Sequence, residues 1–102
     1  MYDAKRVLVV GSDRTPQICA DLLKPRFETR HAQIDALNTS DLHWSEFILA
    51  IEGKHRRLIA QRFPQEYLLR RVVSLNLDTV PEKRGEQTIR ELLISHDLIP
   101  SE

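Results

Sequence analysis

The chain contains few of the residues that define several well-known protein classes. It has a single cysteine, so it cannot form an internal disulfide, and this favours a reducing, cytoplasmic location over secretion. It has only three glycines, and none lies in a triple-glycine or Gly-x4-Gly-Lys nucleotide-binding motif. The apolar run near the amino terminus is shorter than a signal-peptide core and far too short to cross a bilayer. We therefore expect no disulfide scaffold, no glycine-rich nucleotide loop and no membrane association.

The chain also lacks an excess of charge of either sign. Its 15 basic and 15 acidic side chains cancel, so the overall charge favours neither nucleic acid nor an anionic membrane as a partner. The scattered histidines His31, His43 and His96 show no metal-ligand spacing with Cys19. We therefore expect neither a metal nor a cofactor.

What the chain does have is enough apolar sequence for one core. Its 102 residues are 41% hydrophobic and 29% charged, as in ordinary globular domains. That length supports one hydrophobic core and is too short for two. Residues 1–102 are therefore expected to form a single domain.

Four segments have the apolar patterns of β-strands. Val7–Val10 and Phe47–Ile51 are continuous apolar runs, which are typical of strands covered on both faces in a parallel sheet. Phe27–Ile34 alternates weakly and is polar enough for an edge strand. Arg71–Leu77 is rich in valine and leucine and is predicted to be a further central strand.

Helices are expected between these strands. Thr15 suits the N-cap and Pro16 the first position of a helix that Pro25 ends. Lys54–Phe63 predicts a basic amphipathic helix that ends at the next proline, and Glu82–Leu98 predicts the last helix. Residues 37–45 are expected to form a connecting turn with about one turn of helix.

The order of these elements predicts the fold class. It is strand, helix, strand, turn, strand, helix, strand, helix. Strands that alternate with helices of this length imply right-handed crossovers and a parallel sheet with helices on both faces. The sequence therefore predicts an α/β fold with three layers, α/β/α, around a mainly parallel four-stranded sheet.

The loop after the first strand is a candidate anion-binding site. In open α/β proteins anions bind where a strand turns into a helix, because the helix N–H groups point outward there. The loop consists of Gly11, Ser12, Asp13, Arg14 and Thr15. The arginine and the two hydroxyls, together with free N–H groups, are suited to hold an oxyanion. In the alternative interpretation, the aspartate or the threonine caps the helix and the arginine is simply solvated.

A second candidate is the basic cluster Lys54, His55, Arg56 and Arg57. Cations at the start of a helix oppose its dipole, so another interaction is expected to favour them. The functional interpretation is a docking patch for an acidic partner or nucleic acid, of which we expect the acidic partner. The alternative is a solvated helix face whose charge Glu52 neutralises in part.

Several of these segments resemble a known family. In Leu42–Arg57, a tryptophan-containing turn precedes an apolar strand, an acidic residue and a His-Arg-Arg helix start. Arg62–Pro64 and Arg71–Leu75 continue the pattern. The chain resembles the low-molecular-weight tyrosine phosphatase superfamily, in its branch of short bacterial predicted tyrosine phosphatases. The resemblance extends from about Lys5 to Leu98 and implies the three-layer fold of that superfamily.

The chain departs from that family at the residues that carry its chemistry. The family's phosphate loop is a Cys-x5-Arg cradle followed by Ser-Pro, in which the thiolate attacks phosphorus. Gly11 stands where the cysteine is expected, and Arg14–Pro16 resembles the Arg-Ser-Pro, so the loop is about three residues shorter. Cys19 lies beyond the loop on the apolar side of the helix and is expected in the core. Asp78 is the nearest candidate for the family's general acid, but no Asp-Pro pair is present.

Two functions of different class follow from this comparison. The first is a catalytically inactive phosphatase-like domain that binds an anionic or phosphorylated partner, or that acts as a protein-interaction module. The alternative is an active phosphatase-like hydrolase with altered chemistry at the loop, in which Asp13 or Asp78 works with Ser12. A phosphocarrier similar to the IIB components of sugar phosphotransferase systems is a weaker third hypothesis. Those components also need a cysteine at the end of the first strand, and Gly11 argues against it.

Overall fold

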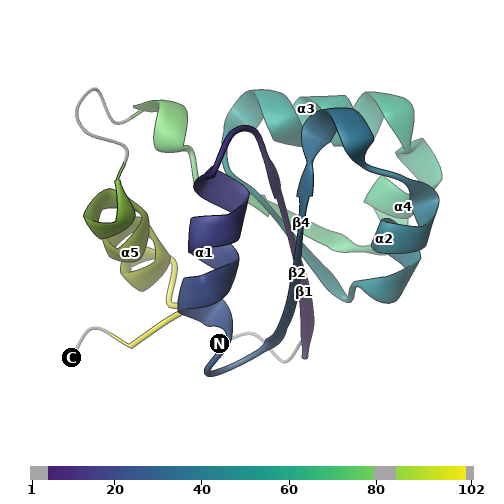
Figure 1. Ribbon diagram of the computed structural model, residues 1–102. Helices are drawn as coiled ribbons and strands as arrows, with labels where there is room; N and C mark the ends of the chain where they lie inside the picture. The colour runs from purple at the N-terminus through teal and green to yellow at the C-terminus, as the bar shows by residue number, and fades with distance from the viewer. Residues whose placement is uncertain (1–4, 80–84, 101–102) are drawn as a thin grey trace.

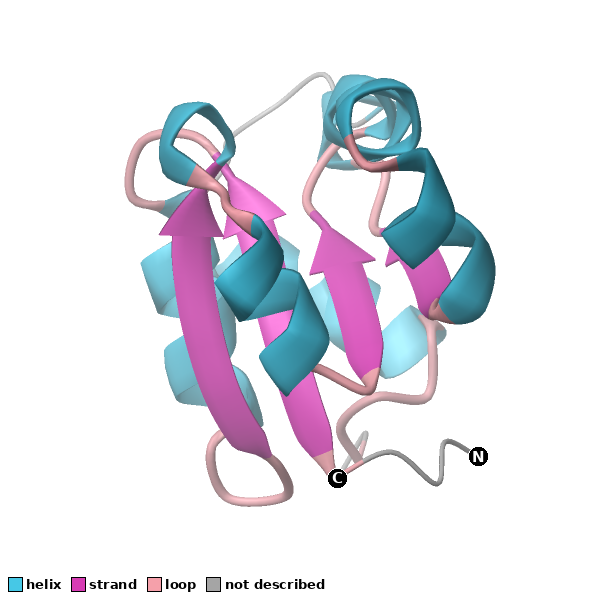
Figure 2. Cartoon of the chain, turned by 90° about the vertical axis from the view of Figure 1, so that its right-hand side faces the viewer, coloured by secondary structure: helices cyan, strands magenta, loops and turns pink. Residues whose placement is uncertain are grey.

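A four-stranded sheet forms the centre of the molecule in the computed structural model, which describes residues 5–79 and 85–100. All four strands are parallel, as their arrowheads in Figure 2 show, and their order across the sheet is β2-β1-β3-β4. The strands are β1 (Arg6–Gly11), β2 (Glu28–Gln33), β3 (Phe47–Ala50) and β4 (Arg71–Ser74).

Helices cover both faces of this sheet, which confirms the predicted three-layer α/β/α architecture. On one face lie α1 (Thr15–Leu23) and α5 (Glu86–Ser95) (Figure 1). On the other face lie α2 (Thr39–Trp44), α3 (Gly53–Arg62) and α4 (Pro64–Leu69) (Figures 1 and 2). Two short 3-10 helices follow β2 and β4, namely η1 (Ile34–Ala36) and η2 (Leu77–Thr79).

Strand β1 shows why a continuous apolar run lies at the centre of such a sheet. Val7 and Val9 pack into the core on the face of α1 and α5, whereas Leu8 and Val10 pack into the core on the face of α3. All four side chains are fully buried. Successive side chains of a strand point to opposite faces, so a strand with helices on both sides needs an apolar residue at every position.

The last predicted strand differs from the structure in length and in position. The prediction of a central strand over Arg71–Leu77 is wrong, because β4 ends at Ser74 and lies at the edge of the sheet, beside β3. Leu75 and Leu77 are nevertheless fully buried in the core on the face of α1 and α5. An apolar pattern reports burial, and here helices bury the chain beyond the end of the strand. The predicted edge position of β2 is confirmed.

The helices also differ from the predicted segments in two places. Pro64, which was expected only to end a helix, is the first residue of α4. Proline is favoured at the first helical position, and α4 has no buried residue, so no apolar stripe marks it in the sequence. The described part of the last helix is Glu86–Ser95, and residues 82–84 lie outside the described residues. The helix ends before Leu98 because Asp97 adopts a left-handed conformation with φ 61°.

The described helices are short. The longest, α3 and α5, have 10 residues each. Within residues 5–79 and 85–100, no helix is long and apolar enough to cross a membrane. The same residues contain no cluster of three or more histidine, cysteine, aspartate or glutamate side chains that could hold a metal ion.

Candidate functional site

Three segments meet at the edge of the sheet where the parallel strands end (Figure 1). They are the loop after β1, the turn from β3 into α3, and the segment from β4 into η2. The N–H of Leu77 donates to the carbonyl of Ile51 at 3.0 Å, and the hydroxyl of Ser12 lies 3.5 Å from Nε2 of His55. Open α/β folds bind their ligands at this edge, and the loop after β1 and the start of α3 both lie there.

Gly11, the last residue of β1, is packed too closely to carry a side chain. A Cβ atom built on it would lie 2.6 Å from Cγ1 of Ile51 and 3.1 Å from Cγ of Pro16. Real Cβ contacts are essentially never shorter than 3.0 Å, so Ile51 would have to move. Gly11 does not have a positive φ, so close packing and not backbone conformation requires the glycine. The position to which the phosphatase resemblance assigns a cysteine therefore faces the buried side chain of Ile51.

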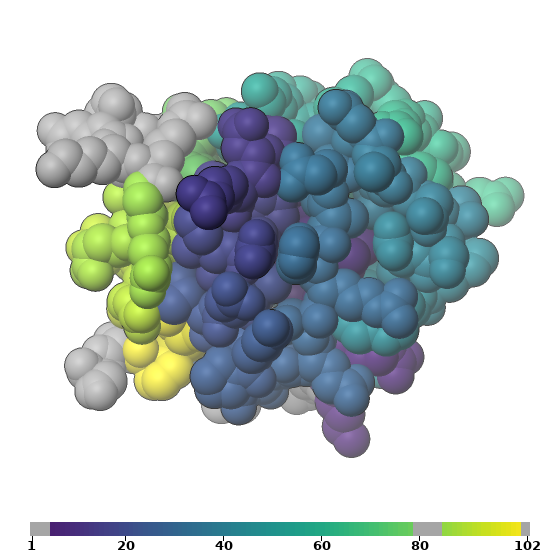
Figure 3. Space-filling model, viewed as in Figure 1, coloured from purple at the N-terminus to yellow at the C-terminus, as the bar shows by residue number. Residues whose placement is uncertain are grey.

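One side chain from β2 and one from the start of α1 bond to the main chain of the loop after β1. Asp13 adopts a left-handed conformation with φ 61°, and its carbonyl accepts a hydrogen bond from Nε2 of Gln33 at 2.7 Å. The hydroxyl of Thr15 donates to the carbonyl of Ser12 at 2.7 Å. The loop lies at the molecular surface, next to the segment that follows β2 (Figure 3). The shortened loop is therefore an ordered turn.

The first turn of α1 has no side-chain cap. The prediction that Thr15 is the N-cap is wrong, because its hydroxyl is used by the Ser12 carbonyl and the N-cap is Arg14. Asp13 does not cap the helix either. The side chain of Arg14 is exposed and has no hydrogen bond or ion pair within the described residues. An uncapped first turn leaves N–H groups without helical partners, and here they lie beside an unpaired guanidinium group.

His55 is only 1% exposed, so its assignment to an exposed docking patch is wrong. It forms a reciprocal cap with Glu52 at the start of α3. The side chain of Glu52 accepts from the N–H of His55, and the N–H of Glu52 donates to Nδ1 of His55 at 3.2 Å. Burial lowers the pKa of His55, and the nearby Glu52 carboxylate offsets this in part. The imidazole is therefore neutral near pH 7.

The cap also decides which ring nitrogen carries the proton. A neutral imidazole has one N–H, and Nδ1 is the acceptor for Glu52, so the proton is assigned to Nε2. Nε2 faces the hydroxyl of Ser12. His55 is therefore a donor toward Ser12 and not the base that would activate a nucleophilic serine. The hydroxyl proton of Ser12 stays available for another acceptor.

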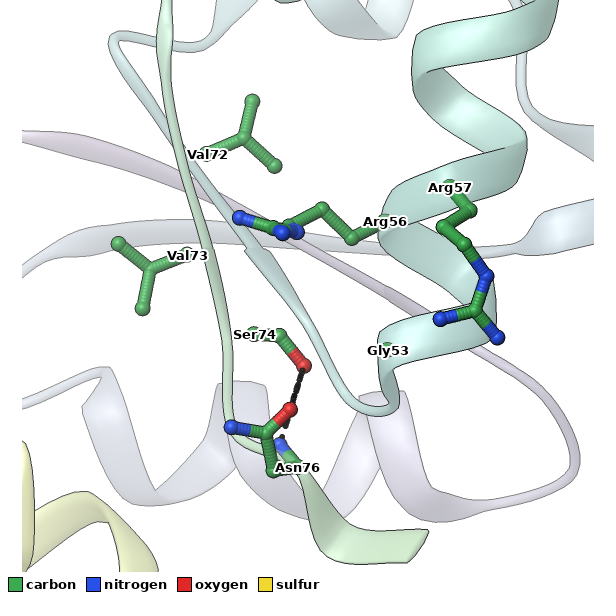
Figure 4. A pocket seen from close by; sticks show the side chains of 7 residues that line it. All are labelled: Gly53, Arg56, Arg57, Val72, Val73, Ser74 and Asn76. Carbon is green, nitrogen blue, oxygen red and sulfur yellow. Dashed lines mark hydrogen bonds between the residues drawn. The ribbon is translucent and has the colours of Figure 1, made fainter.

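The remaining members of the basic cluster have separate environments. Lys54 pairs with Glu52, at 3.6 Å between Nζ and Oε1. Arg56 and Arg57 are exposed, have no hydrogen bond or ion pair within the described part of the chain, and line a pocket of about 380 Å³ (Figure 4). The cluster predicted as one patch is thus an ion pair, a buried cap and two unpaired arginines.

Cys19 lies in the core, as predicted. It is fully buried, and burial raises the pKa of its thiol to about 12. The thiolate is the nucleophilic form of cysteine, so this thiol is neither accessible nor ionised near pH 7. Asp78 is exposed in η2, and its charge reaches His55, where it raises the pKa slightly against the effect of burial. Asp78 follows Leu77, which bonds to Ile51, so Asp78 lies at the same edge of the sheet as the loop after β1.

Sequence reasoning missed the other wall of the pocket. That wall comes from β4 and the residue that follows it, and it consists of Val72, Val73, Ser74 and Asn76. Asn76 has a positive φ of 59°, and its N–H bonds to the hydroxyl of Ser74 at 3.1 Å. A Ser-x-Asn turn after a strand is a recognisable signal for such a bend, but nothing in it indicates which helix will face it.

Neither a family model nor a curated protein matches the chain. Solved structures do. The arginine phosphatase YwlE from Geobacillus stearothermophilus is similar with a TM-score of 0.61 and 16% identity, over 92% of this chain and 85% of that one. A YwlE mutant from Bacillus subtilis is similar with a TM-score of 0.63 and 16% identity, over 92% and 93%. A YwlE mutant with a phosphorylated active-site serine is similar with a TM-score of 0.62 and 16% identity, over 91% of this chain and 90% of that one.

These similarities concern the fold. At 16% identity, a shared chain trace over nine-tenths of the molecule shows a common architecture and leaves the chemistry open. The all-parallel four-stranded sheet with helices on both faces agrees with it. The protein has an α/β fold of the low-molecular-weight tyrosine phosphatase type.

Proposed function

We propose that this protein is a single-domain, catalytically inactive relative of the phosphatases, which binds an anionic or phosphorylated partner at the loop after β1. The packing of Gly11 carries the proposal. A nucleophile in the expected position would collide with Ile51, and the one cysteine of the chain is buried in the core. The chain therefore has no accessible thiolate, which the mechanism of these phosphatases requires.

Anion binding at the loop is supported by three kinds of donor. The first turn of α1 is uncapped, the guanidinium group of Arg14 is unpaired, and the hydroxyl of Ser12 is free to donate. A helix N-terminus contributes about 0.3–1 kcal/mol to an exposed anion. A charged hydrogen bond contributes about 1.5–3 kcal/mol. Together these contribute about 2–4 kcal/mol of binding free energy, which corresponds to dissociation constants of about 1 mM or higher for a small anion.

A larger partner would bind more tightly by adding contacts outside the loop. The structural neighbours are named as arginine phosphatases, so phosphorylated side chains of proteins are the natural first candidates. We place the protein in the cytoplasm, because its single cysteine fits a reducing compartment.

An amide NMR titration tests this function. Phosphate, tungstate, phosphotyrosine and phosphoarginine should each produce saturable shifts at residues 11–15. Arg14→Gln should raise the dissociation constant measured at these residues about tenfold, in line with the loss of one charged hydrogen bond. Lys24→Gln is the matched control, since it removes the same charge from the other end of the same helix. Absence of saturable shifts in the loop at ligand concentrations on the order of 100 mM would refute the proposal.

A second candidate, a hydrolase with altered chemistry, has one observation in its favour. Ser12 touches His55, and the charge of Asp78 reaches the same imidazole. The assigned tautomer opposes it, because Nε2 donates toward the serine. Turnover of aryl phosphates by the purified protein, lost in Ser12→Ala, Asp13→Ala or Asp78→Ala, would favour this candidate over binding. Absence of turnover would remove it.

A further inference from the structure

A pocket of about 380 Å³ lies between the first two turns of α3 and the edge strand β4 (Figure 4). Arg56 extends from α3 toward β4, and Arg57 lies along the first turn of the helix, near Gly53. The opposite wall is apolar at Val72, whereas the side chain of Val73 points to the other face of the sheet (Figure 4). Ser74 and Asn76 supply hydroxyl and amide groups at the end of the strand.

Arg56 and Arg57 differ from most of the described arginines because neither has a partner. Other arginines there have partners: Arg62 and Arg70 donate to main-chain carbonyls, and Arg90 pairs with a carboxylate. Among residues 5–79 and 85–100, the guanidinium groups without a hydrogen bond, ion pair or ring contact are those of Arg14, Arg56 and Arg57. Two of these three line one cavity. Two unpaired cations at one cavity repel each other, and an anion between them removes this repulsion.

We propose that this pocket is a second anion-binding site, which takes a phosphate monoester with a compact apolar carrier. Guanidinium groups match phosphate oxygens with paired hydrogen bonds, and two of them match the two charges of a monoester. The pocket volume falls in the range of small-molecule sites and exceeds what a bare phosphate needs. The remaining space lies against Val72, whose side chain is on the α3 face of the sheet and suits an apolar carrier and not a second charge.

The second site is separate from the loop after β1. His55 faces that loop, with Nε2 against Ser12, whereas the next two residues of α3 line the pocket toward β4. The buried cap of Glu52 and His55 stands between them. The inference therefore goes beyond the proposed function, and each site can bind or fail to bind without the other.

Phenyl phosphate is the probe, because it joins a dianion to a compact apolar ring. In an amide NMR titration near pH 7.5 it should produce saturable shifts at residues 53–57 and 72–76. Arg56→Gln and Arg57→Gln should each weaken binding at these residues at least tenfold. Both side chains are exposed and without an internal partner, so both variants should unfold at the same urea concentration as the parent.

Two controls separate a specific site from general attraction. Lys54→Gln removes a charge from the same helix outside the pocket and should change phenyl phosphate binding less than twofold. Benzoate keeps the ring but has a single charge, and it should bind at least tenfold more weakly than phenyl phosphate. Equal weakening by Lys54→Gln, equal binding of benzoate, or absence of shifts at the pocket would each overturn the proposal.

The loop site is followed in the same spectra. Arg14→Gln should weaken binding at residues 11–15 about tenfold and leave binding at the pocket unchanged, so the failure of one site is distinguishable from the failure of the other. A phosphotyrosine peptide then identifies the source of the ligand. Tighter binding of the peptide than of phenyl phosphate at the pocket supports a phosphorylated protein as ligand, and weaker binding supports a small phosphorylated molecule.

Discussion

Replacing Gly11 by alanine should destabilise the protein, although the substitution adds only one methyl group. The new Cβ would lie 2.6 Å from Cγ1 of Ile51 and 3.1 Å from Cγ of Pro16. Cγ1 is in the middle of a buried side chain, so it cannot swing aside as the end of a flexible chain would. Either the end of β1 or the end of β3 must shift.

Two opposing effects set the size of the loss. Overpacking of a well-packed core costs about 1–3 kcal/mol. Replacing glycine restricts the unfolded chain, which returns about 0.4–1 kcal/mol. The free energy of unfolding should therefore fall by about 1–2 kcal/mol, a sizeable part of the roughly 5–15 kcal/mol expected of a domain of this length.

Urea unfolding followed by circular dichroism measures this loss, and a double-mutant cycle assigns it to one contact. Ile51→Ala removes Cγ1 and should by itself cost about 2–5 kcal/mol. In that background Gly11→Ala should cost less than about 0.5 kcal/mol, so the two sites should be coupled by about 1 kcal/mol or more. Valine would not serve in place of alanine at position 51, because it retains Cγ1.

Gly53→Ala is the matched control. Its Cβ would meet no atom closer than Nη1 of Arg57 at 3.5 Å, which is an ordinary contact, and Gly53 lies within α3. Its stability should be unchanged or up to about 1 kcal/mol higher. If Gly11→Ala is neutral or stabilising, or if the cycle shows no coupling with Ile51, the close-packing argument is wrong.

Three further predictions concern Gly11, His55 and Cys19. Gly11→Cys should give no turnover of aryl phosphates and should lose at least as much stability as Gly11→Ala, because the new Sγ meets the same obstacle; turnover above that of the parent would contradict this. Because burial lowers the pKa of His55, the unfolded chain takes up a proton first as the pH falls. Stability should therefore decrease below about pH 6.5, the pKa of an unperturbed histidine. Urea unfolding at pH 7.5 and 5.5 should show a smaller decrease for His55→Asn, which keeps an acceptor for Glu52; an equal decrease would exclude His55 as the cause. A disulfide reagent should label Cys19 only as fast as the protein unfolds, since the thiol is buried with a pKa of about 12; labelling faster than unfolding would show that the thiol is accessible.

The fold could be predicted because the residue pattern of its central strands indicates that both of their faces are buried. Val7–Val10 is apolar at every position, and only a strand between two helical layers needs that. The place of β4 could not be predicted in the same way. Leu75 and Leu77 extend the apolar pattern past the end of the strand, but they are buried by α5 and its neighbours and not by sheet pairing. The local sequence pattern indicates which residues are buried. The order of the strands depends on the path of the connections between them, which the local pattern does not indicate.

The basic cluster shows the limit of charge patterns. Successive residues of a helix point about 100° apart, so four adjacent cations cannot share one environment. Lys54 forms an ion pair with Glu52, and His55 forms a buried cap with the same residue. Arg56 then extends toward β4, and Arg57 lies along the first turn of α3. A cap with glutamate at its N-cap position differs from the usual serine or threonine capping box, so the sequence offered no familiar signal for the burial of His55.

The sequence predicts that a turn beginning at Gly11 follows the first strand, but it does not show why position 11 is a glycine. The residue that fills the space, Ile51, is itself held in place: its N–H donates to Val10 at 2.9 Å and its carbonyl accepts from Leu77 at 3.0 Å. A side chain at position 11 would therefore disturb the junction of β1, β3 and η2 together. Under the proposed function, thiolate chemistry could return only through coordinated changes at several positions. Binding through the exposed arginines makes no such demand on the core, since Arg14, Arg56 and Arg57 can each be exchanged without loss of an internal contact.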